Sequence, residues 1–192
     1  MRVTRALTAL TLSASLAFSA SAFAAPERYQ IDPTHSFVEF AISHLGFSVL
    51  KGRFNDISGS FSYDPDNPAA SQIEVKVKTA SIDSNHAERD KHLRNKDFLD
   101  VEKYPEARFK STGFQPKGED GVLTGELTLH GVTKPITVDV KFVGAGKDPW
   151  GGYRRGYVGT TTIKRADWGI SYDLGPAAEN VELQFFLEGI RQ

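Results

Sequence analysis

The sequence predicts an all-β domain: a single antiparallel sheet of about eight strands, curled into a barrel or a sandwich, with a short helical insertion around residues 85–100. The main observation is a period-2 alternation of apolar and polar residues, clearest over 73–78, 136–142 and 181–188. Short turn-forming segments separate these runs, so consecutive strands are expected to pair antiparallel. We see no linker, repeat or low-complexity tract in the part of the chain after residue 24.

The elements follow in chain order. The expected strands are 36–42, 49–54, 58–63, 73–78, 107–114, 122–129, 136–142, 155–163 and 181–188. Phe186 breaks the alternation of the last one. Turns are expected at 64–68, where two prolines lack a ladder donor, and at the glycine-containing segments 117–121, 130–135 and 148–152.

The insertion is predicted to contain a helix over about 86–94. Asn85 can cap this helix, and Glu88, three residues later, can complete a capping box. The helix has few apolar residues to bury, so we expect it at the surface or as a lid. Phe98 and Leu99 are the residues expected to anchor the insertion to the sheet, before Tyr104-Pro105 forces extended backbone.

The charged residues of the insertion first suggest an active site. His86 and Asp90 share one helix face, and Glu88 and His92 share nearly the opposite face. Each face offers two ligands, where a zinc site needs three or four. The sequence also lacks a G-x-S-x-G elbow and a phosphate-binding glycine loop. We therefore expect no catalytic residue, no metal and no cofactor, and read these pairs as contacts along a solvated helix.

The N-terminal segment predicts export. Arg2 and Arg5 precede an apolar run that is too short to span a bilayer, and Ala22-Phe23-Ala24 is a small-x-small cleavage site. We expect a signal peptide over 1–24, cleaved to leave one periplasmic domain over 25–192 that does not span a membrane. The absence of cysteine excludes disulfides and thiolate metal ligands. Without the two arginines of the signal, the formal net charge is −3, which argues against a nucleic-acid partner.

Several blocks together resemble the YceI-like family of bacterial periplasmic proteins. They are Asp32-Pro33-Thr34-His35-Ser36, Ser43-His44-Leu45-Gly46-Phe47, Gly52-Arg53-Phe54, the charged run 89–94, Asp97-Phe98-Leu99-Asp100 with Tyr104-Pro105, and 127–135. Each block is weak alone, but their joint order and spacing are specific. The resemblance covers about 29–190.

The resemblance implies an extended lipocalin-like barrel that holds a long amphiphile, a polyisoprenoid or a fatty-acid-like molecule, in an apolar lumen. It also implies links to isoprenoid quinone handling and stress responses, and a possible homodimer. The residues that we expect to contact the ligand are His35, Phe37, Phe40, His44, Phe47, Arg89, Asp90, His92 and Phe98.

Three alternatives stay open from the sequence. Arg89 and Asp90 could receive the polar head of a lipid or only fix the insertion to the barrel. The protein could be an enzyme on an isoprenoid or quinone-like substrate that uses histidines and carboxylates of 85–99. It could also be an interaction module with a solid core, because about eight strands can either fill a barrel or enclose one small ligand.

Overall fold

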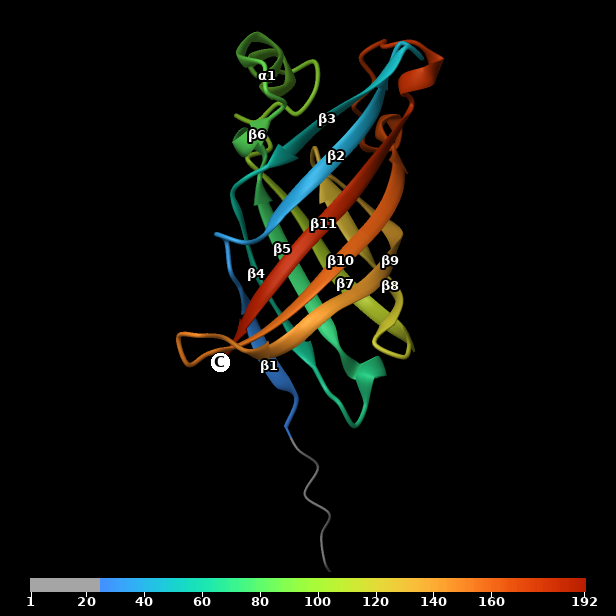
Figure 1. Ribbon diagram of the computed structural model, residues 1–192. Helices are drawn as coiled ribbons and strands as arrows, with labels where there is room; N and C mark the ends of the chain where they lie inside the picture. Colours follow the sequence, from blue (N-terminus) through green and yellow to red (C-terminus); the bar gives the residue numbers. More distant parts are fainter. Residues whose placement is uncertain (1–24) are drawn as a thin grey trace, which may run out of the picture.

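A computed structural model describes residues 25–192, and the predicted signal segment 1–24 lies outside the described residues. Figure 1 shows long tilted strands that wrap around a common axis, with one short helix, α1, at one end. The strands are β1 (Glu27–Ile31), β2 (Phe37–His44), β3 (Ser48–Phe54), β4 (Ile57–Tyr63), β5 (Gln72–Lys78), β6 (Ile82–Asp83), β7 (Glu106–Lys117), β8 (Asp120–Leu129), β9 (Val132–Lys147), β10 (Tyr153–Lys164) and β11 (Asn180–Arg191). The helical elements are α1 (Ala87–Arg94) and the 3₁₀ turns η1 (Pro68–Ala70), η2 (Thr79–Ser81), η3 (Arg165–Trp168) and η4 (Pro176–Ala178).

The sheet closes on itself. Its order is β1-β4-β5-β7-β8-β9-β10-β11, and β1 pairs with β11 to complete a ring of eight antiparallel strands. This confirms the predicted antiparallel barrel and decides between barrel and sandwich. Closure leaves no free edge within the ring, which protects the backbone from pairing with other chains.

The wall beside β11 is made of two strands in succession, β1 and then β2. The last residues of β11 pair with β1, and its first residues pair with β2. Between β1 and β2, Asp32 N donates to Glu188 O at 2.8 Å and Glu188 N donates to Ser36 Oγ at 3.0 Å. These contacts bridge the break, so the ladder bends here without losing its partners. β3 pairs with β2, and β6 pairs with β3, which extends the wall toward α1.

The two ends of the described chain meet at the barrel end opposite α1 (Figure 1). Gln192 N donates to Arg28 O at 2.9 Å, and Arg191 forms an ion pair with Glu27 at 2.9 Å. The β4–β5, β7–β8 and β9–β10 hairpins also turn at this end. The end that carries α1 is therefore formed by a separate set of segments, the β2–β3 hairpin, α1, the β8–β9 turn and the stretch from η3 to η4.

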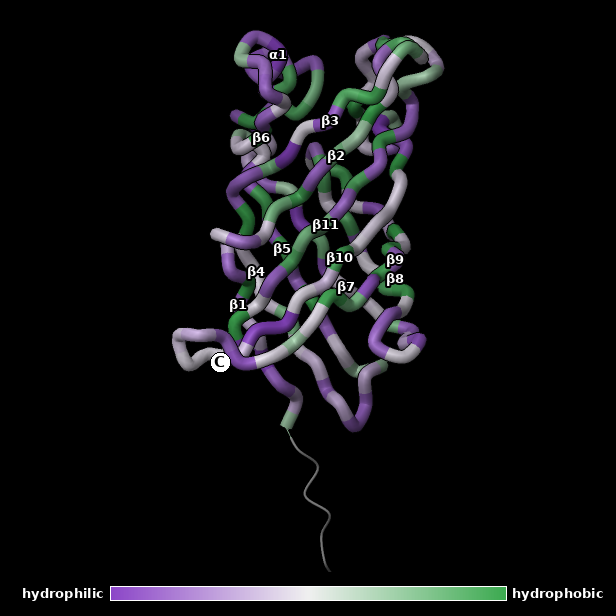
Figure 2. The backbone as a smooth tube through the Cα atoms, in the orientation of Figure 1, coloured by the Kyte–Doolittle hydropathy of each residue, from purple (hydrophilic) through white to green (hydrophobic). Residues whose placement is uncertain are grey.

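The interior follows the alternation of the strands, which Figure 2 shows as hydrophobic and hydrophilic residues taking turns along the backbone. Phe186, the exception in the alternation, lies opposite Phe37 in the ladder, and the two rings stack with centroids 4.8 Å apart. This cross-strand aromatic pair lies on the outer face, where neighbouring residues of the two strands pair directly. Among the described residues, no helix is long and apolar enough to cross a membrane.

Some inward aromatic rings lie over glycines of the neighbouring strand. A Cβ atom on Gly125 would stand 2.4 Å from Cζ of Phe109, and one on Gly52 would stand 2.4 Å from Cζ of Phe40. Each ring therefore occupies the volume that a side chain would fill. Such glycine–aromatic pairs allow large rings to lie flat against a curved sheet.

Helix α1 lies in the predicted insertion, but its N-cap residue differs from the predicted one. His86, and not Asn85, is the N-cap residue, and its side chain accepts from Arg89 N at 3.3 Å. Asn85 adopts a left-handed conformation with φ of 61°, which asparagine tolerates better than most residues. The predicted capping box of Asn85 and Glu88 was wrong because the helix begins one residue later, after the turn at Asn85.

The predicted turn at 130–135 was too long. The structure turns at His130-Gly131 alone and begins β9 at Val132, so Pro135 lies inside a strand opposite Glu126. β10 pairs with β9 only from Asp139 onward. This part of β9 is thus a local sheet edge, where the missing proline donor costs no ladder bond.

Candidate functional site

A cavity of about 420 Å³ fills the half of the barrel nearest α1. Its wall is almost entirely apolar. The apolar lining residues are Val38, Phe40, Ile42, Leu45, Leu50, Phe54, Val75, Val77, Ile82, Leu93, Phe98, Leu99, Ala107, Phe109, Leu127, Leu129, Ile163, Ile170, Leu174, Val181, Leu183 and Phe185. The volume lies in the range of pockets that bury most of a small organic ligand.

The polar lining residues are few. They are Ser43, His44, Arg89, His92, Arg108 and Arg165. Arg165 is buried and donates to the carbonyl oxygens of Ala178 and Ile170, each at 2.8 Å. Arg108 forms an ion pair with Glu74 at 2.9 Å. The polar groups that remain, Ser43, His44, Arg89 and His92, all belong to the β2–β3 hairpin region and α1, so they surround the mouth.

Asp90 fixes the insertion to the barrel wall. Its side chain is buried, and its Oδ1 accepts from Ser84 N at 2.8 Å and from the Ser84 hydroxyl. Arg89 donates from Nε to Ser84 Oγ at 2.7 Å and from Nη2 to Ser84 O. Arg94 donates to Ala80 O and Ile82 O, at the end of the sheet. These contacts assign Asp90 and Arg94 a structural role, whereas Arg89 combines such a role with a place at the mouth.

An aromatic cluster joins the insertion to the segment between η3 and η4. The ring of His92 meets Phe98 edge-on with centroids 4.9 Å apart, and Tyr172 at 5.4 Å. His92 Nε2 lies 3.2 Å from Asp97 Oδ2. Phe98 and Leu99 are buried, as predicted for the anchors of the insertion. The cluster therefore forms one side of the cavity mouth.

Five of the nine predicted ligand residues line this cavity: Phe40, His44, Arg89, His92 and Phe98. The other four lie elsewhere. Phe37 stacks on Phe186 on the outer face, Asp90 is turned toward Ser84, and Phe47 is 87% exposed at the tip of the β2–β3 hairpin. His35 lies at the break between β1 and β2.

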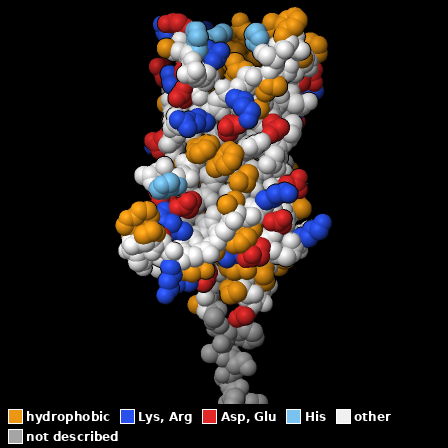
Figure 3. All heavy atoms as spheres, viewed as in Figure 1, with side chains coloured by type: hydrophobic (Ala, Val, Ile, Leu, Met, Phe, Trp, Pro, Cys, Tyr) orange, Lys and Arg blue, Asp and Glu red, His pale blue; other side chains and the backbone are white. Residues whose placement is uncertain are grey.

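The mouth end of the molecule also carries an exposed apolar surface. Figure 3 shows hydrophobic side chains gathered at the end where the β2–β3 hairpin lies. The exposed large hydrophobic residues of this hairpin are Leu45, Phe47 and Val49. Apolar surface therefore continues from the cavity to the outside along one hairpin.

The break between β1 and β2 holds a charged network instead of a ligand site. Ligand atoms of Asp32, His35 and Glu188 lie within 4.8 Å of one another, close enough for a metal ion. Arg154 already supplies the positive charge, because its Nη1 donates to Asp32 at 2.7 Å and to Glu188, while its Nε donates to Asp148 at 2.9 Å. We read the cluster as an ion-pair network that fixes the bend.

This network shifts the protonation of its members. Burial alone would raise the pKa of Asp32, but hydrogen bonds from Thr34, Arg154 and His35 outweigh it and hold the pKa well below its usual range. The pKa of Asp148 is lowered in the same way, by donors on Gly152, Arg154 and Trp150 that overcome its desolvation. Both carboxylates thus stay ionised to lower pH than free side chains.

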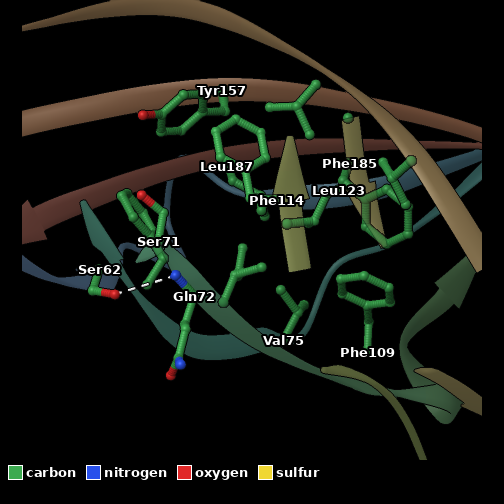
Figure 4. A pocket seen from close by; sticks show the side chains of 15 residues that line it. Ser62, Ser71, Gln72, Val75, Phe109, Phe114, Leu123, Tyr157, Phe185 and Leu187 are labelled. Atoms are coloured by element: carbon green, nitrogen blue, oxygen red, sulfur yellow. Dashed lines mark hydrogen bonds between the residues drawn. The ribbon is translucent and has the colours of Figure 1, made fainter. Parts of the chain in front are cut away.

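A second, smaller cavity of about 80 Å³ lies deeper in the barrel. Figure 4 shows its wall, with Phe109 and Phe185 on one side and Tyr157 and Ser71 toward the other. Val75, Phe109 and Phe185 line both cavities. The two spaces are therefore neighbours along the barrel axis, separated at these residues.

Comparison with known proteins assigns the chain to a family. A family profile described as the YceI-like domain matches residues 29–189. The chain belongs to the YceI-like family. It is 51% identical over 188 residues to a UPF0312 protein of Pseudomonas aeruginosa, covering 98% of each chain, and 51% identical over 187 residues to one of a Shewanella species, covering 97% and 98%.

Solved structures of YceI-like and related proteins share the fold. BcnA of Burkholderia cenocepacia superposes with a TM-score of 0.73 at 25% identity, covering 82% of this chain and 98% of that one. The YCEI protein of Campylobacter jejuni gives a TM-score of 0.70 at 31% identity, covering 79% and 90%. A polyisoprenoid binding domain from Saccharophagus degradans gives 0.64 at 19% identity, covering 85% and 98%, which shows a common fold.

Sequence reasoning missed part of the wall of this YceI-like cavity. Ile170 and Leu174 come from the irregular segment between η3 and η4, which carries no strand or helix periodicity. Val181, Leu183 and Phe185 were identifiable as inward-facing residues of an alternating strand. The period-2 pattern could therefore have found much of the lining, but not the closing segments at the mouth.

Proposed function

We propose that this YceI-like protein binds a long apolar chain with a polar end, of the isoprenoid or fatty-acid type, in the cavity next to α1. The observation that carries the proposal is the cavity itself, about 420 Å³ with an almost wholly apolar wall. A hydrocarbon chain gains about 0.8 kcal/mol for each methylene that leaves water. A lumen of this kind fits such a chain better than it fits a sugar or a nucleotide, which need many polar partners.

The polar end of the ligand is proposed to lie at the mouth, near Arg89, His92 and His44. Arg89 uses Nε and Nη2 on Ser84, and a guanidinium carries five N–H donors, so further donors are left for a ligand. An anionic or hydrogen-bond-accepting head, such as a carboxylate or a phosphate, suits these groups. The lining has no Asp or Glu among residues 25–192, so it offers no carboxylate pair for hydrolysis.

A related fold supports the chemical class. The domain from Saccharophagus degradans is described as polyisoprenoid-binding, and it shares the barrel at 19% identity. The site residues proposed for the present chain rest on its own cavity. We further propose that the protein acts as a carrier in the periplasm, reached through the signal over 1–24. Cell fractionation with a C-terminal tag tests that location: the processed protein should leave with the periplasmic fraction, and retention in the cytoplasm would contradict export.

Binding can be tested by titrating delipidated protein with prenyl alcohols and fatty acids by isothermal calorimetry. We expect saturable binding of one chain per barrel. Leu183→Gln places an amide in the middle of the apolar wall and should weaken binding at least tenfold, as should Val181→Gln. Thr162→Gln adds the same amide on the outer face of β10 and serves as the control. Absence of binding to the wild-type protein, or equal binding by all four proteins, would overturn the proposal.

A further inference from the structure

The interior of the barrel is divided by two aromatic rings. Phe109 on β7 and Phe185 on β11 lie with ring centroids 6.4 Å apart, and both side chains are buried. Both line the cavity next to α1 and also the smaller cavity beyond it. Val75 on β5 is the third residue shared by the two walls.

The strand order explains why these rings meet. In the closed ring β1-β4-β5-β7-β8-β9-β10-β11, the strands β7 and β11 are four positions apart out of eight. They therefore form opposite walls, and side chains that point inward from the same level approach each other across the lumen. Val75 lies directly opposite Phe109 in the β5–β7 ladder, so it extends the same level along the wall.

The ring of Phe109 is held in place by its neighbours. It covers Gly125 on β8 so closely that a Cβ atom there would lie 2.4 Å from Cζ. Leu127 stands directly opposite Phe109 in the β7–β8 ladder. The ring of Phe109 occupies the space that a side chain at position 125 would fill, so the division is a feature of the packing.

Beyond the division lies a space that is suited to the end of a hydrocarbon chain. Its wall includes Phe114, Leu123, Val140 and Leu187, and its serine and glutamine residues, Ser62, Ser71 and Gln72, lie toward one side (Figure 4). No charged residue belongs to its lining among the described residues. This space is smaller than the cavity next to α1, and its lining lacks the arginines and histidines of that cavity.

We propose that Phe109 and Phe185 set the length of the chain that the protein accepts, and that the smaller cavity is an additional subsite closed off by these rings. The proposal rests on the proposed function, because it assumes that an apolar chain enters from the mouth near α1. A chain would lie between Val181 and Phe185 of β11 and stop at the two rings. Removing one ring would join the cavities and admit a longer chain.

The size of the added space can be worked from β11. The lining of the smaller cavity extends two residues further, from Phe185 to Leu187, or about 7 Å along an antiparallel strand. An extended chain advances about 1.2 Å per bond, since three backbone bonds span about 3.5 Å. The joined lumen should therefore hold about six more carbon atoms than the wild-type cavity.

The test is a binding series with straight-chain fatty acids of increasing length, measured with delipidated full-length protein. For the wild type, affinity should rise about fourfold with each added methylene and then stop rising at one length. In Phe109→Ala and Phe185→Ala, the rise should continue for about six more carbons. Phe114→Ala widens the smaller cavity without opening the division, so its limiting length should equal that of the wild type.

The outcomes separate the two proposals. If the wild type binds no chain of any length, the proposed function fails. If the wild type binds but shows no limiting length, or if the limiting length of both opened variants equals that of the wild type, the proposed function stands and the role of the two rings is refuted. Phe109→Leu and Phe185→Leu provide milder openings in case an alanine variant does not fold, and they should shift the limit in the same direction.

Discussion

Replacement of Asp90 by alanine should destabilise the protein without impairing its cavity. The carboxylate is buried and accepts two hydrogen bonds from Ser84, one from the amide and one from the hydroxyl. A hydrogen bond to a charged group contributes about 1.5–3 kcal/mol, and part of this loss is recovered when water reaches the site near the surface. We expect the free energy of unfolding to fall by about 3 kcal/mol, or about 6–12 °C in melting temperature for a domain of this size.

The assay is urea denaturation followed by circular dichroism, combined with calorimetric binding of a fatty acid at a temperature where both proteins are folded. Asp90→Asn keeps an acceptor oxygen but loses the charge, so about half of the effect should remain. Glu88→Ala, an exposed carboxylate on the same helix, is the matched control and should change stability by less than about 0.5 kcal/mol.

The reasoning fails if Asp90→Ala retains wild-type stability but loses affinity for the ligand. That result would place the carboxylate at the polar end of the ligand, which is the alternative that the sequence left open. If Asp90→Ala lowers both stability and affinity, the two quantities are compared in Asp90→Asn. Affinity that returns in parallel with stability supports the structural role.

Four further predictions follow from buried groups. The pKa of Asp32 is lowered in the folded state, so its contribution to stability is complete above about pH 4, the unfolded value, and is lost as the pH falls below it. Asp32→Asn should therefore reduce the loss of stability at acid pH, measured by denaturation at a series of pH values. An unchanged acid dependence would contradict this. Burial raises the pKa of Tyr29, together with a hydrogen bond to Glu27 and the charge of that residue, and burial also raises the pKa of Tyr157. Stability should therefore decrease above about pH 10, and ultraviolet titration should show two phenols that ionise later than the rest. Ionisation of all six phenols together would contradict this prediction. Leu99→Ala should cost about 2–5 kcal/mol, measured by urea denaturation, because it empties the buried anchor of the insertion; a loss below 1 kcal/mol would mean that the insertion is held by other contacts. Gly125→Ala should cost about 1–3 kcal/mol by the same measurement, because the new methyl would overlap an aromatic ring and a backbone oxygen; a neutral result would show that the ring moves freely.

The barrel could be predicted because its information is local. Alternation over strands such as 73–78 and 181–188 specifies which side chains point inward, and turn residues specify antiparallel succession. The closure of the sheet into a barrel could not be predicted in this way. It depends on the pairing of Tyr29 with Arg191, residues at opposite ends of the described chain, which no local pattern encodes.

The errors at segment ends have local physical causes. The helix starts at Ala87 because Asp90 reaches back to Ser84 and turns the chain at Asn85, a contact that helical capping rules do not anticipate. Pro135 was taken as part of a turn, since prolines rarely enter strands. It is accommodated because the neighbouring strand starts to pair only four residues later.

The candidate site was predictable only in part. Phe40, an aromatic residue of the strand predicted over 36–42, and Phe98, an aromatic residue of the block at 97–100, both line the cavity. Phe37 has the same residue type and lies three residues before Phe40 in β2, so it is on the opposite face of the strand and stacks there on Phe186. The charged insertion also resembles an active site by composition alone, whereas its contacts bind it to the sheet. The homodimer remains a prediction from the family resemblance.

The meeting of both chain ends at the barrel end opposite α1 has a practical consequence. Gln192 and Arg28 are joined by a backbone hydrogen bond there, and the β2–β3 hairpin and α1 lie at the far end of the barrel. A fluorophore, an affinity tag or a surface tether attached after Gln192 would leave the cavity mouth free. An immobilised protein would thus present its mouth to solution, so that loading and release of a ligand could be followed in real time on a sensor surface.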